Sequence, residues 1–272
     1  MTMETKIHRL AGAVDLPLLV SPSIPAGFAH GFTTRAGGAS QPPFATLNLG
    51  WKWGDDRAAV DENHRRLLLA SSVRTMFRAS QVHGVGILRV RGGDDPRSVA
   101  IREADGLCSD EPGLGLSVHV ADCTPILLAC SRTGACAALH AGWRGTVAGV
   151  VRAGVDSLAF HFGCRPWHLN AALGPCIGAC CFEVGPEVVD AFVAAVPAAR
   201  ENGVVLATGE AKPHIDLRRF QRLQLEAAGL LPENIDASSE CTHCDPSGRF
   251  YSFRRSGRST GQLAGFISRL PT

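Results

Sequence analysis

Apolar residues recur along this chain with two spacings, which separate the expected strands from the expected helices. Short apolar runs bounded by glycine, proline or aspartate are typical of buried strands, and they occur at 85–90, 115–120, 125–130, 135–140 and 168–173. Apolar positions three or four residues apart are typical of amphipathic helices, and they occur at 55–72, 146–159, 186–196 and 217–230. Asp216 is a possible N-cap of the last helix. The pattern predicts a mixed α and β architecture without revealing the strand order.

Length and composition narrow the class of protein. With 272 residues, 45% of them apolar, the chain can bury a large core, and no repeat or linker divides it, so we expect one domain over residues 1–272. The 27 basic and 25 acidic residues are mixed along the chain, which argues against a nucleic-acid partner. Asp15 and Pro17 interrupt the apolar stretch near the start, and no apolar run reaches the roughly 18 residues of a membrane span. We therefore expect a cytoplasmic protein.

The ten cysteines are better explained as reduced thiols or metal ligands than as a disulfide framework, because the chain is large and has no export pattern. Cys130 and Cys136 lie inside apolar runs and are expected in the core. Cys241, His243 and Cys244 resemble half a zinc finger, but no second pair follows at finger spacing. We expect these thiols to be structural or redox-tolerant.

The segment HAGWRG, residues 140–145, joins an expected strand to an expected helix. His140 would end the strand, and Gly142 and Gly145 would permit a tight turn or the close approach of backbone to a ligand. Arg144 and the start of the following helix would favour an anion. Taken alone, the segment is better explained as an ordinary strand-to-helix turn with a hydrogen-bonded histidine and a surface arginine.

Two further segments, SQVHG and VADCTPILL, place His83 and Cys123 beside other expected strands. Together with His140 they form a set of ligands suited to zinc, and three protein ligands would leave a fourth position open, as in catalytic sites. The wide spacing does not establish proximity. Each residue alone has a plainer explanation, a half-buried histidine or a core thiol.

These segments also carry a family resemblance. SQVHG, ADCTP, HAGWRG and LGPCIGACCFEVG occur in the same order as in the laccase-domain family, also called the multicopper polyphenol oxidase or peptidoglycan-editing-factor family. TTRAGGAS at 33–40, LNLG at 47–50 and the segment 241–267 are similar to its terminal motifs. The resemblance implies an α+β fold, a single sandwich of mixed sheets flanked by helices in four layers, of α/β/β/α type. Ser256 departs from the pattern, because the family commonly has an acidic residue there.

The resemblance further implies zinc bound by His83, Cys123 and His140, one ion per chain. The implied activity is phosphorolysis of adenosine, inosine, guanosine and methylthioadenosine, with adenosine deamination at the same site. Purine nucleoside and phosphate would be the partners, and monomer and homodimer both stay open. Arg144 and Arg35 would supply positive charge for the phosphate. Asp122 is a candidate proton shuttle, although a role as a turn or strand-end cap is favoured.

Three other functions are alternatives to phosphorolysis. Copper oxidase chemistry is disfavoured because the chain has three methionines and no His-x-His pair. Cys123 with His83 or His140 could instead be the nucleophile and base of an amidase that edits a peptidoglycan precursor. A non-enzymatic protein with structural zinc would need a fourth ligand such as Asp122 or His119, but His119 and Cys123 do not readily face one metal from a single strand.

Overall fold

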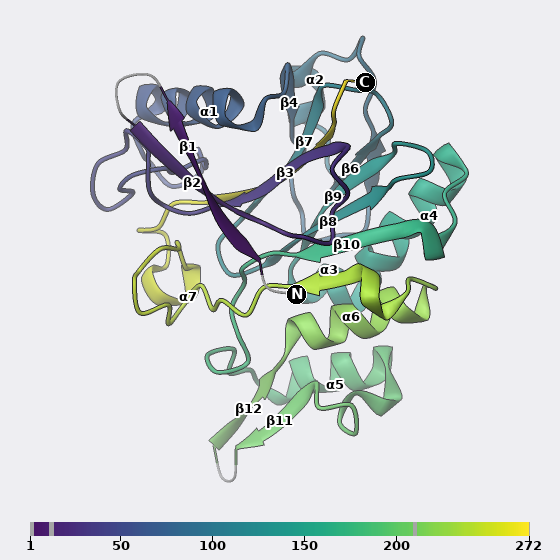
Figure 1. Ribbon diagram of the computed structural model, residues 1–272. Helices are drawn as coiled ribbons and strands as arrows, with labels where there is room; N and C mark the ends of the chain where they lie inside the picture. The colour runs from purple at the N-terminus through teal and green to yellow at the C-terminus, as the bar shows by residue number, and fades with distance from the viewer. Residues whose placement is uncertain (1–2, 11–13, 209–210, 272) are drawn as a thin grey trace.

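Two six-stranded sheets form the centre of the molecule in the computed structural model, which describes residues 3–10, 14–208 and 211–271 (Figure 1). Both sheets mix parallel and antiparallel neighbours. The strands of the first sheet, in spatial order, are β1 (Glu4–Leu10), β2 (Val14–Val20), β3 (Phe28–Thr33), β14 (Leu263–Arg269), β7 (Leu114–Val120) and β4 (Thr75–Phe77). Those of the second are β13 (Ile235–Ala237), β10 (Leu169–Leu173), β8 (Thr124–Cys130), β9 (Cys136–Ala141), β6 (Gly106–Ser109) and β5 (Ile87–Arg89).

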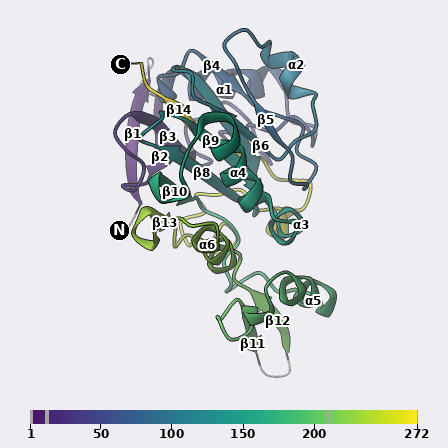
Figure 2. The same cartoon turned by 90° about the vertical axis from the view of Figure 1, so that its right-hand side faces the viewer.

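Helices cover the outer faces of the two sheets. Helix α1 (Arg57–Ser71) packs on β1, β2 and β3, whereas α4 (Val150–Phe162) packs on β5, β6 and β9 and α6 (Leu217–Ala227) on β13. This arrangement confirms the predicted α+β sandwich flanked by helices. The other helices are α2 (Pro96–Ala100), α3 (Trp143–Ala148), α5 (Pro186–Ala195) and α7 (Phe253–Ser256). Helix α5 and the hairpin of β11 (Val205–Thr208) and β12 (Ala211–Ile215) extend away from the sheets (Figure 2).

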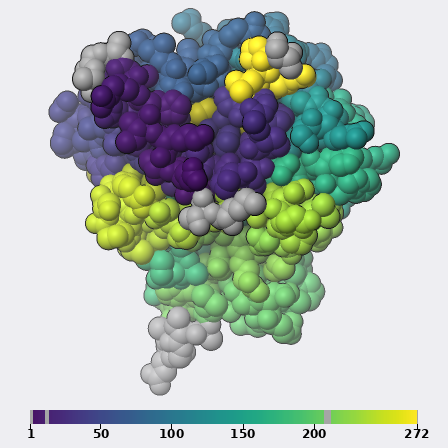
Figure 3. Space-filling model, in the orientation of Figure 1, coloured from purple at the N-terminus to yellow at the C-terminus, as the bar shows by residue number. Residues whose placement is uncertain are grey.

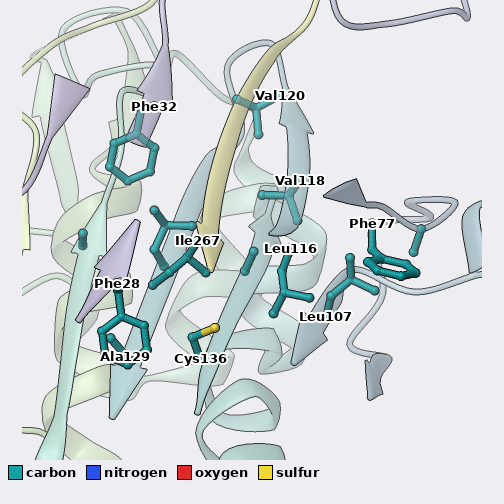
Figure 4. Packing of buried hydrophobic residues seen from close by; sticks show 14 of the residues in the cluster. Phe28, Phe32, Phe77, Leu107, Leu116, Val118, Val120, Ala129, Cys136 and Ile267 are labelled. Carbon is teal, nitrogen blue, oxygen red and sulfur yellow. The ribbon is translucent and has the colours of Figure 1, made fainter. Parts of the chain in front are cut away.

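The main core lies between the facing sheets. Phe32 and Ile267 from the first sheet pack toward Ala129 and Cys136 from the second, and all four are at most 1% exposed (Figure 4). A second apolar cluster lies between the second sheet and its helices and contains Cys130. The prediction that Cys130 and Cys136 are core thiols is therefore confirmed. Alternating residues of β8 and β9 face opposite clusters, which explains why these strands are continuous apolar runs.

The predicted helices are confirmed with one correction. The expected helix from Thr146 begins at Trp143 and is divided at Gly149, whose φ of 95° ends α3 and starts α4. Asp216 caps α6 as expected, because its carboxylate accepts a hydrogen bond from Arg219 N at 3.0 Å. Among the residues that the structure describes, none of the helices combines the length and hydropathy that a membrane span requires.

Candidate functional site

His83, Cys123 and His140 converge at one end of the sandwich although they are distant in sequence. His83 lies in the loop between β4 and β5, Cys123 in the link from β7 to β8, and His140 on β9. Their potential ligand atoms all lie within 4.8 Å of one another, and Cys123 Sγ is 4.0 Å from His83 Nε2. His83 is exposed and His140 is buried, so the group is open to solvent on one side.

Two of the loops that build this group contain a non-glycine residue in the left-handed region. His83 has a φ of 63° and Asp122 a φ of 91°. Such conformations cost free energy and occur preferentially at functional sites, where the surrounding structure holds them in place. At Asp122 the chain crosses from the first sheet to the second, and this crossing brings Cys123 beside the end of β9.

Asp105 is the anchor of the group, and sequence reasoning missed it. Its fully buried carboxylate accepts hydrogen bonds from His140 Nδ1 at 2.8 Å and from the backbone N–H groups of His83 at 2.9 Å and Gly84 at 2.6 Å. Because Nδ1 of His140 is held in this way, Nε2 is the atom left to bind a ligand. Asp105 lies 35 residues from His140 in sequence, so no local spacing marks it as a partner.

Cys123 and His140 stabilise each other's charged forms. Burial opposes ionisation of both side chains, but the imidazolium of His140 lowers the pKa of the Cys123 thiol. The thiolate and Asp105 in turn raise the pKa of His140. A thiolate is the form of cysteine that binds metals and attacks electrophiles, so the same pair suits either chemistry.

The carboxylate of Asp122 is engaged by the C-terminal part of the chain. One oxygen accepts a hydrogen bond from Thr242 Oγ1 and the other from the backbone N–H of Arg254, both at 2.6 Å. Both carboxylate oxygens therefore serve to hold the turn that carries Cys123. These contacts support the role of Asp122 as a cap rather than as a proton shuttle.

The two glycines of HAGWRG allow close packing around the group. A Cβ on Gly142 would lie 2.8 Å from His83 Cδ2 and 2.9 Å from Cys123 Sγ. A Cβ on Gly145 would lie 2.9 Å from the carbonyl oxygen of Gly84. These glycines therefore let the backbone of HAGWRG pack directly against the candidate ligands and the loop that carries His83.

The two predicted phosphate-binding arginines pack on aromatic rings. Arg144 is exposed, and its guanidinium lies 4.4 Å from the ring centroid of Trp143. Arg35 donates from Nε to the carbonyl oxygen of Ala45 at 2.8 Å and lies 5.0 Å from the ring centroid of Tyr251. Their contact with a substrate stays a prediction.

A basic pocket of about 1000 Å³ lies on the face formed by α1, α2, β4 and Trp51, and no motif in the sequence marks it. Its lining includes Trp51 and His64, whose rings stack at 4.1 Å, and the arginines Arg57, Arg65, Arg74, Arg78 and Arg97. The ring centroid of His119 lies 5.4 Å from that of His64. Burial holds the pKa of His119 well below its usual value. His119 is absent from the convergent group around Cys123, as the strand geometry predicted.

The convergent group fits a metal ion. It combines one thiolate-forming cysteine with two histidines, one of which is oriented by a buried carboxylate, and this is a common arrangement of metal ligands. Asp122, which could have closed the site as a fourth ligand, uses both oxygens elsewhere. Within the part of the chain that the structure describes, no further cysteine, histidine or carboxylate joins these three side chains as a potential ligand.

Fold and site together define the class of protein. The family model described as multi-copper polyphenol oxidoreductase laccase matches residues 29–270, and the chain belongs to this family. Among its relatives, purine nucleoside phosphorylase PA4543 of Pseudomonas aeruginosa is 43% identical over 86% of this chain and 90% of its own. Purine nucleoside phosphorylase LACC1 of the mouse is 35% identical over 93% of this chain, which spans only 58% of that protein.

Purine nucleoside phosphorylase YlmD of Geobacillus stearothermophilus is 38% identical over 90% of this chain and 91% of its own. The crystal structure of YlmD superposes with a TM-score of 0.88 over 98% of this chain and all of the other, at 34% identity. The likeness thus includes the arrangement of both sheets, and it confirms the family resemblance and the fold class.

Proposed function

We propose that this protein is a zinc-dependent purine nucleoside phosphorylase whose site is formed by His83, Cys123 and His140. The observation that carries the proposal is the convergence of these residues, with both histidines held by Asp105, in a chain that is 43% identical to a purine nucleoside phosphorylase. Adenosine, inosine, guanosine and methylthioadenosine are the proposed substrates, and deamination of adenosine is a proposed second activity.

Phosphorolysis replaces the bond between the sugar C1′ and the purine nitrogen by a bond from C1′ to a phosphate oxygen. The products are the free purine, which takes up a proton at the departing nitrogen, and ribose 1-phosphate. When bound, zinc would supply a Lewis-acid centre at an open position. The chain must provide a site for the phosphate anion, side chains that hold the metal in a fixed position, and a site that receives the departing purine.

The residues of the chain divide this work between them. Asp105 holds His140 in one tautomer and orientation, which fixes Nε2 toward the group. Arg144 and Arg35 are proposed to bind phosphate with their guanidinium groups, which suit bidentate contacts with its oxygens. The hydrogen bonds of Asp105 with the His83 backbone and of Asp122 with Thr242 would hold these two strained positions, and with them the proposed ligands, in place during the reaction.

The decisive test is turnover of inosine and adenosine with and without phosphate, with the purine products separated by chromatography. The zinc-loaded protein is expected to release hypoxanthine or adenine only when phosphate is present. In His140→Ala the release should fall at least about 100-fold, because a fixed ligand and its buried hydrogen bond are lost together.

His161→Ala is the matched control, because His161 lies on α4 beside Phe160 and Phe162, outside the convergent group. It should retain the turnover of the unmodified protein. Phosphate-independent release of base, or full activity in His140→Ala, would contradict the proposal. Release of inosine from adenosine, lost in the same variant, would support the second activity.

Copper oxidation, which the family description names, is a less favoured function for this chain. A site of one cysteine and two histidines lacks the clustered histidines that several copper ions need. Oxygen consumption with a phenol can be compared between copper-loaded and zinc-loaded protein at equal concentration. Neither form is expected to consume oxygen at a rate that matches its phosphorolysis of inosine.

A second candidate function is amide hydrolysis on a peptidoglycan precursor. One observation favours it, because Asp105, His140 and Cys123 are connected in the order of an acid, a base and a nucleophile. Alkylation separates the two functions. Iodoacetamide should modify Cys123 rapidly in metal-free protein and slowly after zinc is added, whereas a nucleophile that works without metal would react at the same rate in both.

A further inference from the structure

A second group of four cysteines lies apart from the site described above. Cys180 and Cys181 belong to the loop between β10 and α5, and Cys241 and Cys244 to the turn that follows β13. Their sulfur atoms all lie within 4.8 Å of one another, and Cys180 Sγ is 3.5 Å from Cys244 Sγ. No partner pair follows Cys241 and Cys244 at finger spacing, because the cysteines that approach them come earlier in the chain, with Cys180 preceding Cys244 by 64 residues.

Backbone pairing brings the two segments together. Beyond the parallel strands β10 and β13, an isolated parallel bridge pairs Cys176 with Cys241, and Thr242 N donates to Cys176 O at 3.0 Å. Gly178 has no Cβ, and one built there would lie 3.1 Å from Cys180 Sγ and 3.2 Å from Cys241 Cβ. The backbone bridge between these two segments therefore also brings their thiols close together.

The geometry and chemistry of the group match a tetrathiolate metal site. Zinc–sulfur bonds of about 2.3 Å place the four sulfurs of a regular tetrahedron about 3.8 Å apart, within the range spanned by this group. Cys241 and Cys244 have the C-x-x-C spacing common among zinc ligands. The backbone N–H of Gly178 donates to Cys241 Sγ at 3.2 Å, which stabilises a thiolate there.

Arginines surround the two segments and favour negative charge between them. Arg255 donates to the carbonyl oxygen of His243 at 2.8 Å, and Arg254 to that of Cys181 at 3.5 Å. Arg218 donates at 2.8 Å to the carbonyl oxygen that directly precedes the C-x-x-C turn. Four thiolates around a divalent ion carry a net charge of −2, so these guanidinium groups would lower the cost of forming it.

We propose that Cys180, Cys181, Cys241 and Cys244 bind a second zinc ion in a closed, structural site. The ion ties the loop after β10 to the C-terminal motif. That motif also holds Asp122 through Thr242 and Arg254, so the second site supports the turn that carries Cys123. Cys180 and Cys244 are exposed, so the ion can be loaded from solvent after the chain has folded.

The main alternative is a disulfide between Cys180 and Cys244, whose sulfurs would have to move from 3.5 Å to about 2.05 Å. A disulfide would leave Cys181 and Cys241 as free thiols beside it. A tetrathiolate site uses all four sulfurs and protects all of them from alkylation. The two arrangements therefore differ in both metal content and thiol count.

The test begins with the variant His83→Ala/His140→Ala, which removes two ligands of the first site and leaves every cysteine intact. After loading with Zn²⁺ and removal of loosely held metal, it should retain one zinc ion per chain, against two in the unmodified protein. Reconstituted with Co²⁺, it should show the strong sulfur-to-cobalt charge-transfer absorption of four thiolate ligands. Absence of retained zinc and of this absorption would overturn the proposal.

Cys241→Ser/Cys244→Ser is the complementary variant and should lose one zinc ion while His83, Cys123 and His140 keep the other. If that variant fails to fold, the cobalt spectrum of the histidine variant still decides the question. Intact-mass measurement after alkylation under oxygen-free conditions checks the alternative. A loss of two hydrogens that maps to Cys180 and Cys244 would also overturn the proposal.

Discussion

At the scale of single residues, one buried carboxylate holds much of the convergent group. Asp105 is fully buried, and desolvation alone would raise the pKa of a carboxyl group in such a place. His140 and the backbone N–H groups of His83 and Gly84 outweigh this effect and lower the pKa of Asp105. A carboxylate stabilised in this way is a positioning residue for the two histidines.

Asp105→Asn is expected to weaken zinc binding on the order of 10–100-fold, because the amide cannot accept all the hydrogen bonds of the carboxylate. A competition titration with a chromophoric chelator measures this change directly. Asp110→Asn is the control, since Asp110 is 40% exposed and pairs with Arg89 at 3.8 Å. Equal affinities in both variants would show that Asp105 does not orient the histidines.

Gly142→Ala tests the packing of HAGWRG against the group. The added Cβ would come within 2.9 Å of both His83 and Cys123, so both candidate ligands must shift. A displacement of about 1 Å at a reacting centre costs on the order of 100-fold in rate, and we expect a loss of that size in kcat/KM for inosine. Gly27→Ala is the control, because its Cβ would meet no atom within 4 Å and should leave kcat/KM unchanged.

At the scale of elements, local sequence determines the helices better than their junctions. The spacing of Val147, Val151 and Val155 predicts one helix, yet Gly149 with its φ of 95° divides it into α3 and α4. The break lets α3 begin immediately after the candidate ligands while α4 turns to cover β5, β6 and β9. A single straight helix could not meet both requirements.

Gly149→Ala should therefore destabilise the fold by about 1–2 kcal/mol through backbone strain alone. A Cβ at this position would meet no atom within 4 Å, so no steric clash contributes. Urea denaturation followed by circular dichroism measures the difference in the free energy of unfolding. An unchanged midpoint would mean that the junction tolerates a left-handed alanine without cost.

The limits of sequence reasoning follow from the range of the contacts involved. The apolar runs at 125–130 and 135–140 predict β8 and β9 well, because burial on both faces leaves a continuous apolar pattern. Asp105 and the pairing of Cys180 with Cys244 escape prediction, because their partners lie 35 and 64 residues away. His83, Cys123 and His140 can be proposed from the sequence as a set suited to zinc, but their wide spacing does not show that they meet, and only the family motifs imply that they act together.

At the scale of the whole molecule, the first sheet is completed by a strand from the C-terminal part of the chain. Strand β14, from the C-terminal part, lies between β3 and β7, and its neighbours pair with it over most of its length. Figure 3 shows the C-terminal part of the chain, in yellow, packed at the surface against the purple N-terminal strands. Its apolar residues also face β8 and β9 across the core.

Removal of residues 263–271 should prevent folding, because it takes a central strand out of the first sheet and leaves two unpaired edges. Expression yield and the thermal transition measure the effect, and we expect insoluble protein without a cooperative transition. Removal of residues 4–10, the edge strand β1, is the control and should leave soluble protein with a lower melting temperature. A cooperative transition in the first truncation would contradict the expectation.

The position of β14 also has a consequence for biosynthesis. During translation His83, Cys123 and His140 leave the ribosome long before residues 263–269 do. Until β14 has been synthesised, the first sheet of the nascent chain lacks the strand that lies between β3 and β7. The flanking strands β3 and β7 would then expose backbone edges to other chains. We expect this protein to depend on chaperones during synthesis more than its size suggests, and to aggregate when translation stalls before β14.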